Sequence, residues 1–255
     1  MKDDNQLLSK SIPRLLLTFS LPAVVGLLVN ALYNIVDSIF VGRGVGDLAL
    51  AGVTVSFPIM TIFIACVMLV GMGATALISL RLGQGKKEEA ETIAGNALVL
   101  LVIIGLALTL FGLVFLDKIL ILFGASPQVL PFAKAYMQVI LPGSVFMALG
   151  TGMNNFIRAE GKPRLAMRTM LIGTAVNIVL DYVFIFIFNW GIQGAALATV
   201  LAYMVTSSWV LYHFFAGQSS LKLKGFHFKL KGPILTAILA LGFPSFIVQV
   251  TSSIQ

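Results

Sequence analysis

Apolar stretches of about 20 residues, the length that crosses about 30 Å of hydrocarbon, recur along nearly the whole chain. Of its 255 residues, 58% are hydrophobic and 11% are charged. An average soluble domain has roughly 45–50% apolar and about 25% charged residues. The sequence therefore predicts an all-α membrane protein that crosses the bilayer several times, and it excludes the soluble enzyme folds.

Polar segments divide these stretches into six complete spans and the beginning of a seventh. The predicted spans cover residues 15–41, 48–80, 92–116, 128–157, 165–188 and 191–215. The seventh begins at Pro233 and is still apolar at Gln255. We expect a six-helix transmembrane bundle followed by the start of another helix.

The positive charges indicate the orientation of the chain. If the N-terminus is cytoplasmic, 14 of the 17 Lys and Arg lie in inner segments, and the outer segments hold only Arg43, Lys118 and Lys134. This asymmetry follows the positive-inside rule and predicts a multi-pass protein with a cytoplasmic N-terminus. The net charge of +7 is thus a topology signal, and we expect no nucleic-acid partner.

The seventh span begins like the first. Residues 17–23 read Leu-Thr-Phe-Ser-Leu-Pro-Ala, and residues 239–245 read Leu-Ala-Leu-Gly-Phe-Pro-Ser. Six spans separate the two segments, so both run in the same direction, as in a parallel repeat. The alternative is a chance match. A true repeat divides the chain into a first lobe (1–215), a cytoplasmic linker (216–232) and the beginning of a second lobe (233–255).

Asp37 and Asp181 are the ionisable side chains that lie clearly within the bilayer part of the spans. Such a group costs at least about 2.5–3.5 kcal/mol at the centre of a membrane helix, so it indicates a function. Helical spacing places Asn30 and Asn34 on the face of Asp37 as auxiliary polar groups, and Asn177 on the face of Asp181.

The depth of these groups predicts that they meet. At about 1.5 Å per residue, Asp37, Asp181 and Thr199 all lie roughly 7–12 Å from the outer ends of their spans. Two carboxyl groups in a cavity bind a proton tightly, and with amide and hydroxyl oxygens they also suit Na⁺. The alternative is that these polar groups only hold helices together. The sequence does not choose between H⁺ and Na⁺.

Proline residues interrupt three of the spans. Pro22, Pro58 and Pro142 each remove a backbone hydrogen bond, so each span either bends during function or carries a static kink. Pro22 shares its span with Asp37. We therefore select Pro22 as the candidate conformational hinge.

Several segments resemble the multidrug and toxic compound extrusion (MATE) transporters. Residues 154–163, Asn-Asn-Phe-Ile-Arg-Ala-Glu-Gly-Lys-Pro, resemble the Arg-x-(Gln/Glu)-Gly-(Lys/Arg/Asp)-Pro type of signature in that family. Residues 34–42, residues 81–85 and the Asn177-x-x-x-Asp181 pattern fit its bacterial members. The signature positions in this chain are Arg158, Glu160, Gly161, Lys162 and Pro163. For these positions we expect mainly a structural turn with a topological role.

The resemblance implies a twelve-span protein of two six-helix bundles, of which this chain covers the first. It implies an antiporter of the plasma membrane that exports cationic or amphipathic drugs in exchange for H⁺ or Na⁺, without a cofactor. The implied partners are these compounds and a second, C-terminal lobe; membrane lipids are a further expected partner, because Arg158, Lys162 and Arg164 can alternatively bind lipid phosphates of the inner leaflet. The implied cation-coupling residues are Asp37, Asn177, Asp181, Thr199 and Asn154, although the depth estimate places Asn154 nearer the inner end.

Other functions remain as alternatives. A lipid-linked oligosaccharide flippase of the same superfamily has a more basic cavity, whereas Asp37 and Asp181 favour cationic cargo. A non-transporting membrane scaffold does not explain two carboxyl groups at matched depth. An intramembrane enzyme is not expected, because the sequence has neither His-Glu-x-x-His nor Gly-x-Ser-x-Gly.

Overall fold

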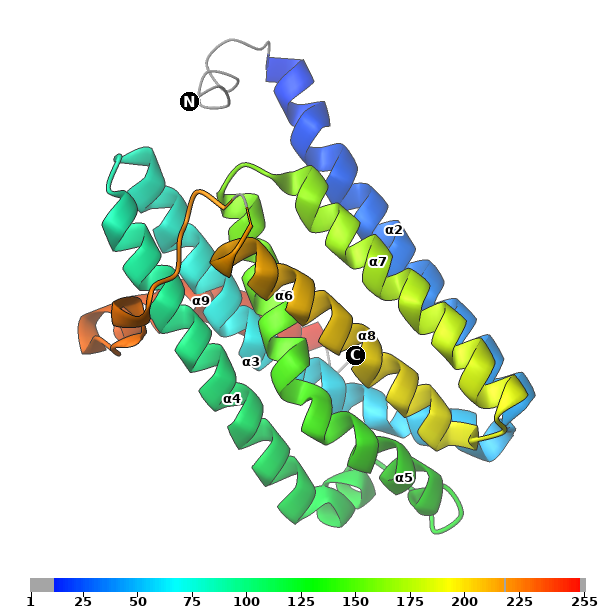
Figure 1. Cartoon of the computed structure of the whole chain (residues 1–255). Coiled ribbons are helices and arrows are strands. Elements are labelled where there is room, and N and C mark those ends of the chain that lie inside the picture. Colours follow the sequence, from blue (N-terminus) through cyan, green and yellow to red (C-terminus); the bar gives the residue numbers. More distant parts are fainter. Residues whose placement is uncertain (1–11, 218, 253–255) are drawn as a thin grey trace.

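The computed structural model describes residues 12–217 and 219–252, without the side chains at positions 12–19, 23, 27, 30 and 226. Every regular element in this part of the chain is a helix (Figure 1). The fold class is therefore all-α, as the sequence predicted.

Seven helical segments in the described residues are long and apolar enough to cross a membrane. They are α2 (Ile12–Gly44), α3 (Asp47–Gly83), α4 (Lys87–Leu122), the pair α5 (Leu130–Ile140) and α6 (Ser144–Ala159), α7 (Pro163–Tyr182), α8 (Gly191–Phe215) and α9 (Gly232–Ser252). The six predicted spans and the start of a seventh are confirmed.

Some helices extend beyond the apolar stretches that predicted them, whereas α8 has the predicted bounds, 191–215. The third span was predicted over 92–116, but α4 runs from Lys87 to Leu122 and carries Glu88 and Glu89 in its first turn. An apolar run marks the part of a helix that suits hydrocarbon, whereas the backbone hydrogen bonds continue into the polar region. Composition therefore locates a span better than it locates the ends of a helix.

The signature segment forms the tight turn between α6 and α7. The Gly161 N–H donates to the Arg158 carbonyl at 2.9 Å, and the Lys162 N–H donates to the Ile157 carbonyl at 3.2 Å. Gly161 has a φ of 78°, which glycine adopts without the steric cost of a Cβ atom. Pro163 is the first residue of α7, where its missing N–H has no cost.

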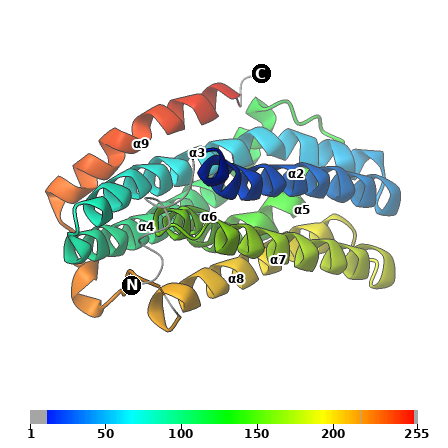
Figure 2. The ribbon, with the colours of Figure 1, turned by 90° about the horizontal axis from the view of Figure 1, so that it is seen from above.

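The helices pack into a bundle with α3 at its centre (Figure 2). α3 contacts α4, α6 and α9, while α2 packs mainly against α7, and α7 packs against α8. α3 and α9 cross at two glycines: a Cβ on Gly73 would meet the Ile238 carbonyl, and a Cβ on Gly242 would meet the Leu69 carbonyl. Small residues let membrane helices approach this closely.

Pro142, in the fourth span, lies at a kink that is hydrogen-bonded to α4. Pro142 is in the short 3₁₀ helix η1 (Leu141–Gly143) between α5 and α6. The Thr109 hydroxyl of α4 donates to the Leu141 carbonyl at 2.7 Å, and the Ser144 hydroxyl donates to the Gly105 carbonyl at 3.0 Å. These two bonds fix the kinked segment to α4, which favours a static kink here.

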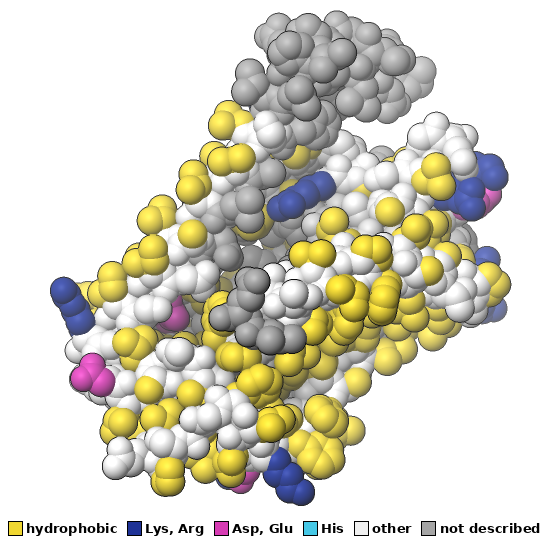
Figure 3. Space-filling view, turned by 180° about the vertical axis from the view of Figure 1, so that it is seen from behind, with side chains coloured by type: hydrophobic (Ala, Val, Ile, Leu, Met, Phe, Trp, Pro, Cys, Tyr) yellow, Lys and Arg dark blue, Asp and Glu magenta, His cyan; other side chains and the backbone are white. Residues whose placement is uncertain are grey.

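The surface of the bundle suits a lipid environment. Figure 3 shows hydrophobic side chains over a broad part of one face, with charged side chains mostly near its margins. Large apolar side chains exposed on α2 and α4 include Leu28, Leu32, Leu106, Leu110 and Phe111. A soluble protein rarely exposes so extended an apolar surface.

Turns of the chain define two ends of the bundle. The connecting segment, residues 219–231, crosses one end, which we call the linker end, and contains the short 3₁₀ helix η3 (Gly225–Phe228). Asn96 of α4 holds this segment: its Nδ2 donates to the carbonyls of His227 and Lys229, both at 3.1 Å, and its Oδ1 accepts from the Lys231 N–H at 2.8 Å. The turns between α2 and α3 and between α7 and α8 lie at the opposite end.

Candidate functional site

Asp37 and Asp181 meet between α2 and α7. Asp37 is 8% exposed and Asp181 is 0% exposed. Their carboxyl groups lie within hydrogen-bonding reach of each other. Two carboxyl groups form such a contact when they share a proton, because two adjacent negative charges repel each other in a buried site. We call Asp37 and Asp181 the aspartate pair.

The aspartate pair is incompletely satisfied. The Oδ1 atoms of Asp37 and Asp181 are buried and have no hydrogen-bond partner in the described structure. A buried polar atom without a partner is costly, and most native structures avoid it. These oxygens are therefore available to a small cation.

Asn177 and Thr199 complete a polar chain beside the pair. Asn177 lies one helical turn before Asp181 on α7, and Thr199 is on α8. With its amide oriented to match donors with acceptors, the Asn177 Nδ2 donates to Asp181 Oδ2 at 2.8 Å. The Asn177 Oδ1 then accepts from the Thr199 hydroxyl at 3.3 Å and from the Thr199 N–H at 3.2 Å. The structure thus brings together Asp37, Asn177, Asp181 and Thr199.

Three tyrosines lie around the polar side chains of Asn177, Asp181 and Thr199. They were not among the predicted site residues. The hydroxyls of Tyr33 and Tyr136 reach Thr199, and Tyr203 lies close enough to Asp37 to interact electrostatically. Tyr33 precedes Asp37 by four residues, and Tyr203 follows Thr199 by four, so helical spacing offered a signal for both. Tyr136 is on α5, and its place depends on tertiary packing alone.

Within the described structure, Asn154 does not lie beside the pair. Asn154 donates from its Nδ2 to the Ala166 carbonyl at 3.2 Å, near the linker end. Ala166 precedes Asp181 by 15 residues, or about 22 Å along α7. Asn34 is exposed, unlike Asp37, because three residues along a helix leave two side chains about 60° apart. The side chain of Asn30 lies outside the described structure.

Aromatic rings lie beside the aspartate pair on the side away from the linker end. Phe40 of α2 contacts Phe186 with ring centroids 5.5 Å apart and Tyr182 with centroids 6.5 Å apart. Phe186 belongs to a π-helical turn, η2 (Val183–Ile187), that begins two residues after Asp181. Such turns occur frequently at functional sites. The sequence analysis did not predict this turn.

Pro22 lies inside α2, 15 residues before Asp37, and it is buried. A proline within a helix removes a backbone hydrogen bond and creates a place where the helix bends easily. The geometry therefore allows motion of the helix that carries Asp37. The hinge role itself remains a prediction.

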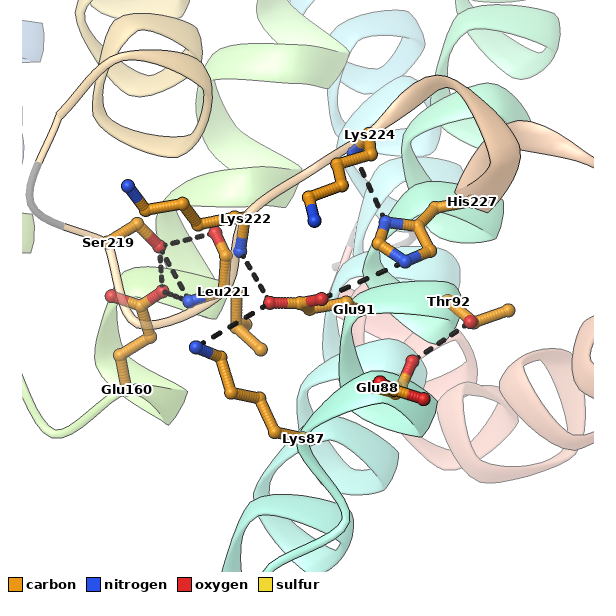
Figure 4. A network of polar contacts seen from close by, with 10 residues as sticks. All are labelled: Lys87, Glu88, Glu91, Thr92, Glu160, Ser219, Leu221, Lys222, Lys224 and His227. Atoms are coloured by element: carbon orange, nitrogen blue, oxygen red, sulfur yellow. Dashed lines mark hydrogen bonds and ion pairs between the residues drawn. The ribbon is translucent and has the colours of Figure 1, made fainter.

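A second pair of buried acidic residues, Glu91 and Glu160, lies at the linker end (Figure 4). Glu160 Oε2 is 3.2 Å from His213 Nε2 and 3.3 Å from Lys162 Nζ. Its Oε1 accepts from the Leu221 N–H at 3.1 Å and from the Ser219 hydroxyl. We call Glu91 and Glu160 the linker glutamates.

Burial alone raises the pKa of the Glu160 carboxyl. Its hydrogen bonds and the nearby ammonium of Lys162 outweigh burial and bring this pKa below its ordinary value of 4.5. Glu160 is therefore an ionised group with several partners. Arg158, in the same signature, is instead exposed, and its guanidinium contacts the Met170 sulfur at 3.3 Å.

Glu91 holds the next part of the connecting segment. Its Oε1 accepts from the Lys222 N–H at 2.9 Å and lies 3.8 Å from Lys87 Nζ. Its Oε2 lies 3.8 Å from His227 Nε2. The linker glutamates thus attach residues 219–227 to α4 and to the turn after α6. Glu160 was predicted as a signature residue, but no sequence pattern predicted these contacts.

Comparison with known proteins supports an assignment to a family. The MatE family model matches residues 22–183. The multidrug export protein MepA of Staphylococcus aureus (strain MRSA252) is 26% identical over 255 residues, which cover 98% of this chain and 56% of that protein.

Two solved structures are similar over the full length of the chain. An outward-facing multidrug resistance MATE family transporter of the MOP superfamily is 32% identical with a TM-score of 0.92, and the match covers 100% of this chain and 56% of that one. A MOP superfamily transporter from Pyrococcus furiosus Vc1, described as having a binding pocket of reverse polarity, is 32% identical with a TM-score of 0.91 and the same coverage.

The chain spans about half the length of the relatives that it matches. The match to the family model nevertheless covers more than half of the chain and includes both aspartates and the signature turn. The chain belongs to the MatE family of MATE transporters.

Proposed function

We propose that this chain forms the first lobe of an antiporter that exports cationic or amphipathic organic compounds in exchange for H⁺ or Na⁺. The observation that carries the proposal is the aspartate pair, whose Oδ1 atoms are both buried and have no hydrogen-bond partner among the described residues. The multidrug relatives support the choice of cargo. In this proposal residues 1–215 are the lobe, 216–232 are the linker and 233–255 begin the second lobe.

The coupling mechanism follows from the charge on the pair. When a proton or Na⁺ enters, it relieves the repulsion between the Asp37 and Asp181 carboxylates and changes how α2 packs against α7. Because Pro22 weakens α2, this change bends the helix and displaces the cargo. Alternating access then comes from movement of the first lobe against the second.

The proposed orientation has the linker end in the cytoplasm of a plasma-membrane protein. The positive-inside distribution supports it, because the inner segments hold 14 of the 17 Lys and Arg. The aspartate pair then lies nearer the outer surface. Cations arriving from outside reach it after passing Phe40 and the π-helical turn.

The second candidate, a lipid-linked oligosaccharide flippase, requires an anionic cargo. No Lys or Arg is among the electrostatic partners of Asp37 and Asp181 within the described structure. An acidic cavity favours a cationic cargo and disfavours an anionic one. The binding pocket of reverse polarity in the archaeal relative gives a protein for direct comparison.

The test uses the complete protein that contains this chain, reconstituted in liposomes. Asp37→Asn and Asp181→Asn should each reduce dye efflux driven by a pH or Na⁺ gradient to the level of empty liposomes. Asp47→Asn is the control, since Asp47 is exposed in the first turn of α3. Full efflux by both aspartate variants would overturn the mechanism, and uptake of an anionic lipid precursor instead of a dye would favour the flippase.

A further inference from the structure

A groove runs along the surface between α7 and α8. Its volume is about 710 Å³, and its lining is almost entirely apolar. The lining residues are Leu180, Leu201, Met204, Val205, Ser208, Trp209 and Tyr212. None of them belongs to the aspartate pair or to its polar neighbours.

A second pocket continues the groove at the linker end. It has a volume of about 530 Å³ and shares Trp209 and Tyr212 with the groove. Its remaining lining residues include Lys162, Leu165 and His213. An apolar groove therefore opens into a partly polar pocket that holds a cationic side chain.

The groove has the length of one membrane leaflet. From Leu201 to Tyr212 it extends over 11 residues of α8, which is about 16 Å. Half of the hydrocarbon core is about 15 Å thick. Leu201 lies about 15 Å from the first residue of α8, Gly191, so the groove runs from the middle of the membrane to the linker end.

The groove lies on the side of the bundle away from α9. α9 packs against α3 and α4, and Figure 2 shows α8 on the opposite side of the bundle, so a second lobe that begins at α9, as in the proposed function, leaves this surface to lipid. Trp209 is 44% exposed and Tyr212 is 65% exposed. Both residue types concentrate where the hydrocarbon meets the lipid head groups.

The polar pocket has the charge to select an anionic head group. The Lys162 side chain is 32% exposed at the pocket, whereas the Glu160 side chain behind it is 0% exposed. Glu160 also contacts His213 Nε2 and accepts from the Leu221 N–H. An ammonium group has three donors, so its ion pair with Glu160 is compatible with a contact to a phosphate.

We propose that the α7–α8 groove and the Lys162 pocket together bind one anionic phospholipid of the leaflet at the linker end. One acyl chain lies along Met204, Val205 and Ser208, and the phosphate contacts Lys162. Trp209 and Tyr212 lie beside the glycerol backbone. The site rests on the membrane placement of α7 and α8 and is independent of the export chemistry.

The test is native mass spectrometry of the complete protein with phosphatidylglycerol or phosphatidylcholine added to the detergent. We expect phosphatidylglycerol to be retained over phosphatidylcholine, and Lys162→Gln to weaken its binding about fivefold, the effect of one basic residue at an anionic lipid surface. Lys162→Arg should restore the binding. Ser208→Trp, which fills the groove, should weaken the binding of both lipids.

Matched controls distinguish the site from general lipid contact. Leu110→Trp places the same bulk on the exposed face of α4, and Lys134→Gln removes a positive charge from the opposite end. Both should leave lipid retention unchanged. Asp37→Asn should also retain the lipid, which separates failure of this proposal from failure of the export mechanism.

Two outcomes would overturn the proposal. Equal retention of the two lipids would assign the groove to unselective boundary lipid. Displacement of phosphatidylglycerol by an amphipathic dye, without loss of lipid binding in Lys162→Gln, would assign the groove to cargo.

Discussion

The two pairs of buried acidic residues in this lobe have opposite surroundings. Glu160, at the linker end, has contacts with Lys162, His213, Ser219 and the Leu221 N–H. The aspartate pair has a polar chain on one side and two buried oxygens without partners. A buried carboxylate with hydrogen-bond and ion-pair partners stabilises the fold. A buried carboxylate that lacks such partners favours the binding of a cation.

The difference in surroundings indicates a structural role for the linker glutamates and a cation-binding role for the aspartate pair, although all four residues carry carboxyl groups. The linker glutamates attach a chain segment to the bundle, and their partners come from the protein itself. The aspartate pair lies between helices with its partners incomplete, and a transported ion can complete them. The predictions below test whether the two pairs differ in this way.

The largest stability effect should come from Glu160→Gln. Removing one partner of a buried, paired charge typically costs about 3–5 kcal/mol of unfolding free energy, because the remaining partners lose their counter-charge. We expect a loss of about 3 kcal/mol, measured by thermal unfolding of the complete protein in detergent.

Glu89→Gln is the matched control for this measurement. Glu89 forms ion pairs with Arg81 at 3.1 Å and with Lys86 at 3.2 Å, but its side chain is 50% exposed. An exposed ion pair contributes about 0–1 kcal/mol. If Glu160→Gln costs no more than Glu89→Gln, the linker glutamates are not the structural pair.

The next effect concerns cation binding. Thr199→Val keeps the shape of the side chain but removes the hydroxyl that Asn177 contacts. Loss of one buried hydrogen bond of about 1.4 kcal/mol should raise the cation concentration for half-maximal efflux about tenfold. Thr236→Val is the control, because that hydroxyl donates to carbonyls of its own helix in the part of the chain that the structure describes. An unchanged half-maximal concentration would remove Thr199 from the site.

Asp181→Asn should have a smaller effect on stability, and of opposite sign. An amide next to Asp37 removes the repulsion between two buried carboxyl groups while keeping their shape. We expect the free energy of unfolding to stay the same or to rise by about 1 kcal/mol, even though coupled export is lost. A loss comparable to that of Glu160→Gln would show that both pairs serve the fold.

The smallest expected effect is the loss of the contact between Glu160 and the connecting segment at low pH. The pKa of Glu160 is lower in the folded protein than its ordinary value of 4.5. Its stabilisation is therefore complete above pH 4.5 and is lost only as the pH falls through the folded value. Hydrogen exchange at the Leu221 amide should stay slow down to pH 4.5 and accelerate below it, after correction for intrinsic exchange.

In Glu160→Gln this pH step should disappear, because the amide does not titrate. Exchange that accelerates already at higher pH would show that Glu160 does not hold the connecting segment.

Sequence patterns predicted the site where its geometry lies along single helices. Asn177 and Asp181 are four residues apart on α7, so their contact follows from helical spacing. Estimates of depth then placed Asp37 and Thr199 in the same layer. The same spacing rule grouped Asn34 with Asp37, yet Asn34 is exposed, because the rotation of α2 against α7 decides which side of that stripe is buried.

No sequence pattern indicated the contacts of the connecting segment. Glu160 and Leu221 are 61 positions apart, and Glu91 and Lys222 are 131 apart. No periodicity relates such positions. Tyr136 is similar, since it reaches Thr199 from a different helix.

The sequence by itself determined the number of membrane-crossing helices and the depth of their polar residues. It did so because hydrocarbon requires about 20 apolar residues for each crossing and satisfies no backbone hydrogen bond. Only the tertiary structure decided which polar groups meet and which keep unpartnered oxygens. The rotation of each helix and the path of the connecting segment arise from packing between distant residues, such as Gly73 against Ile238.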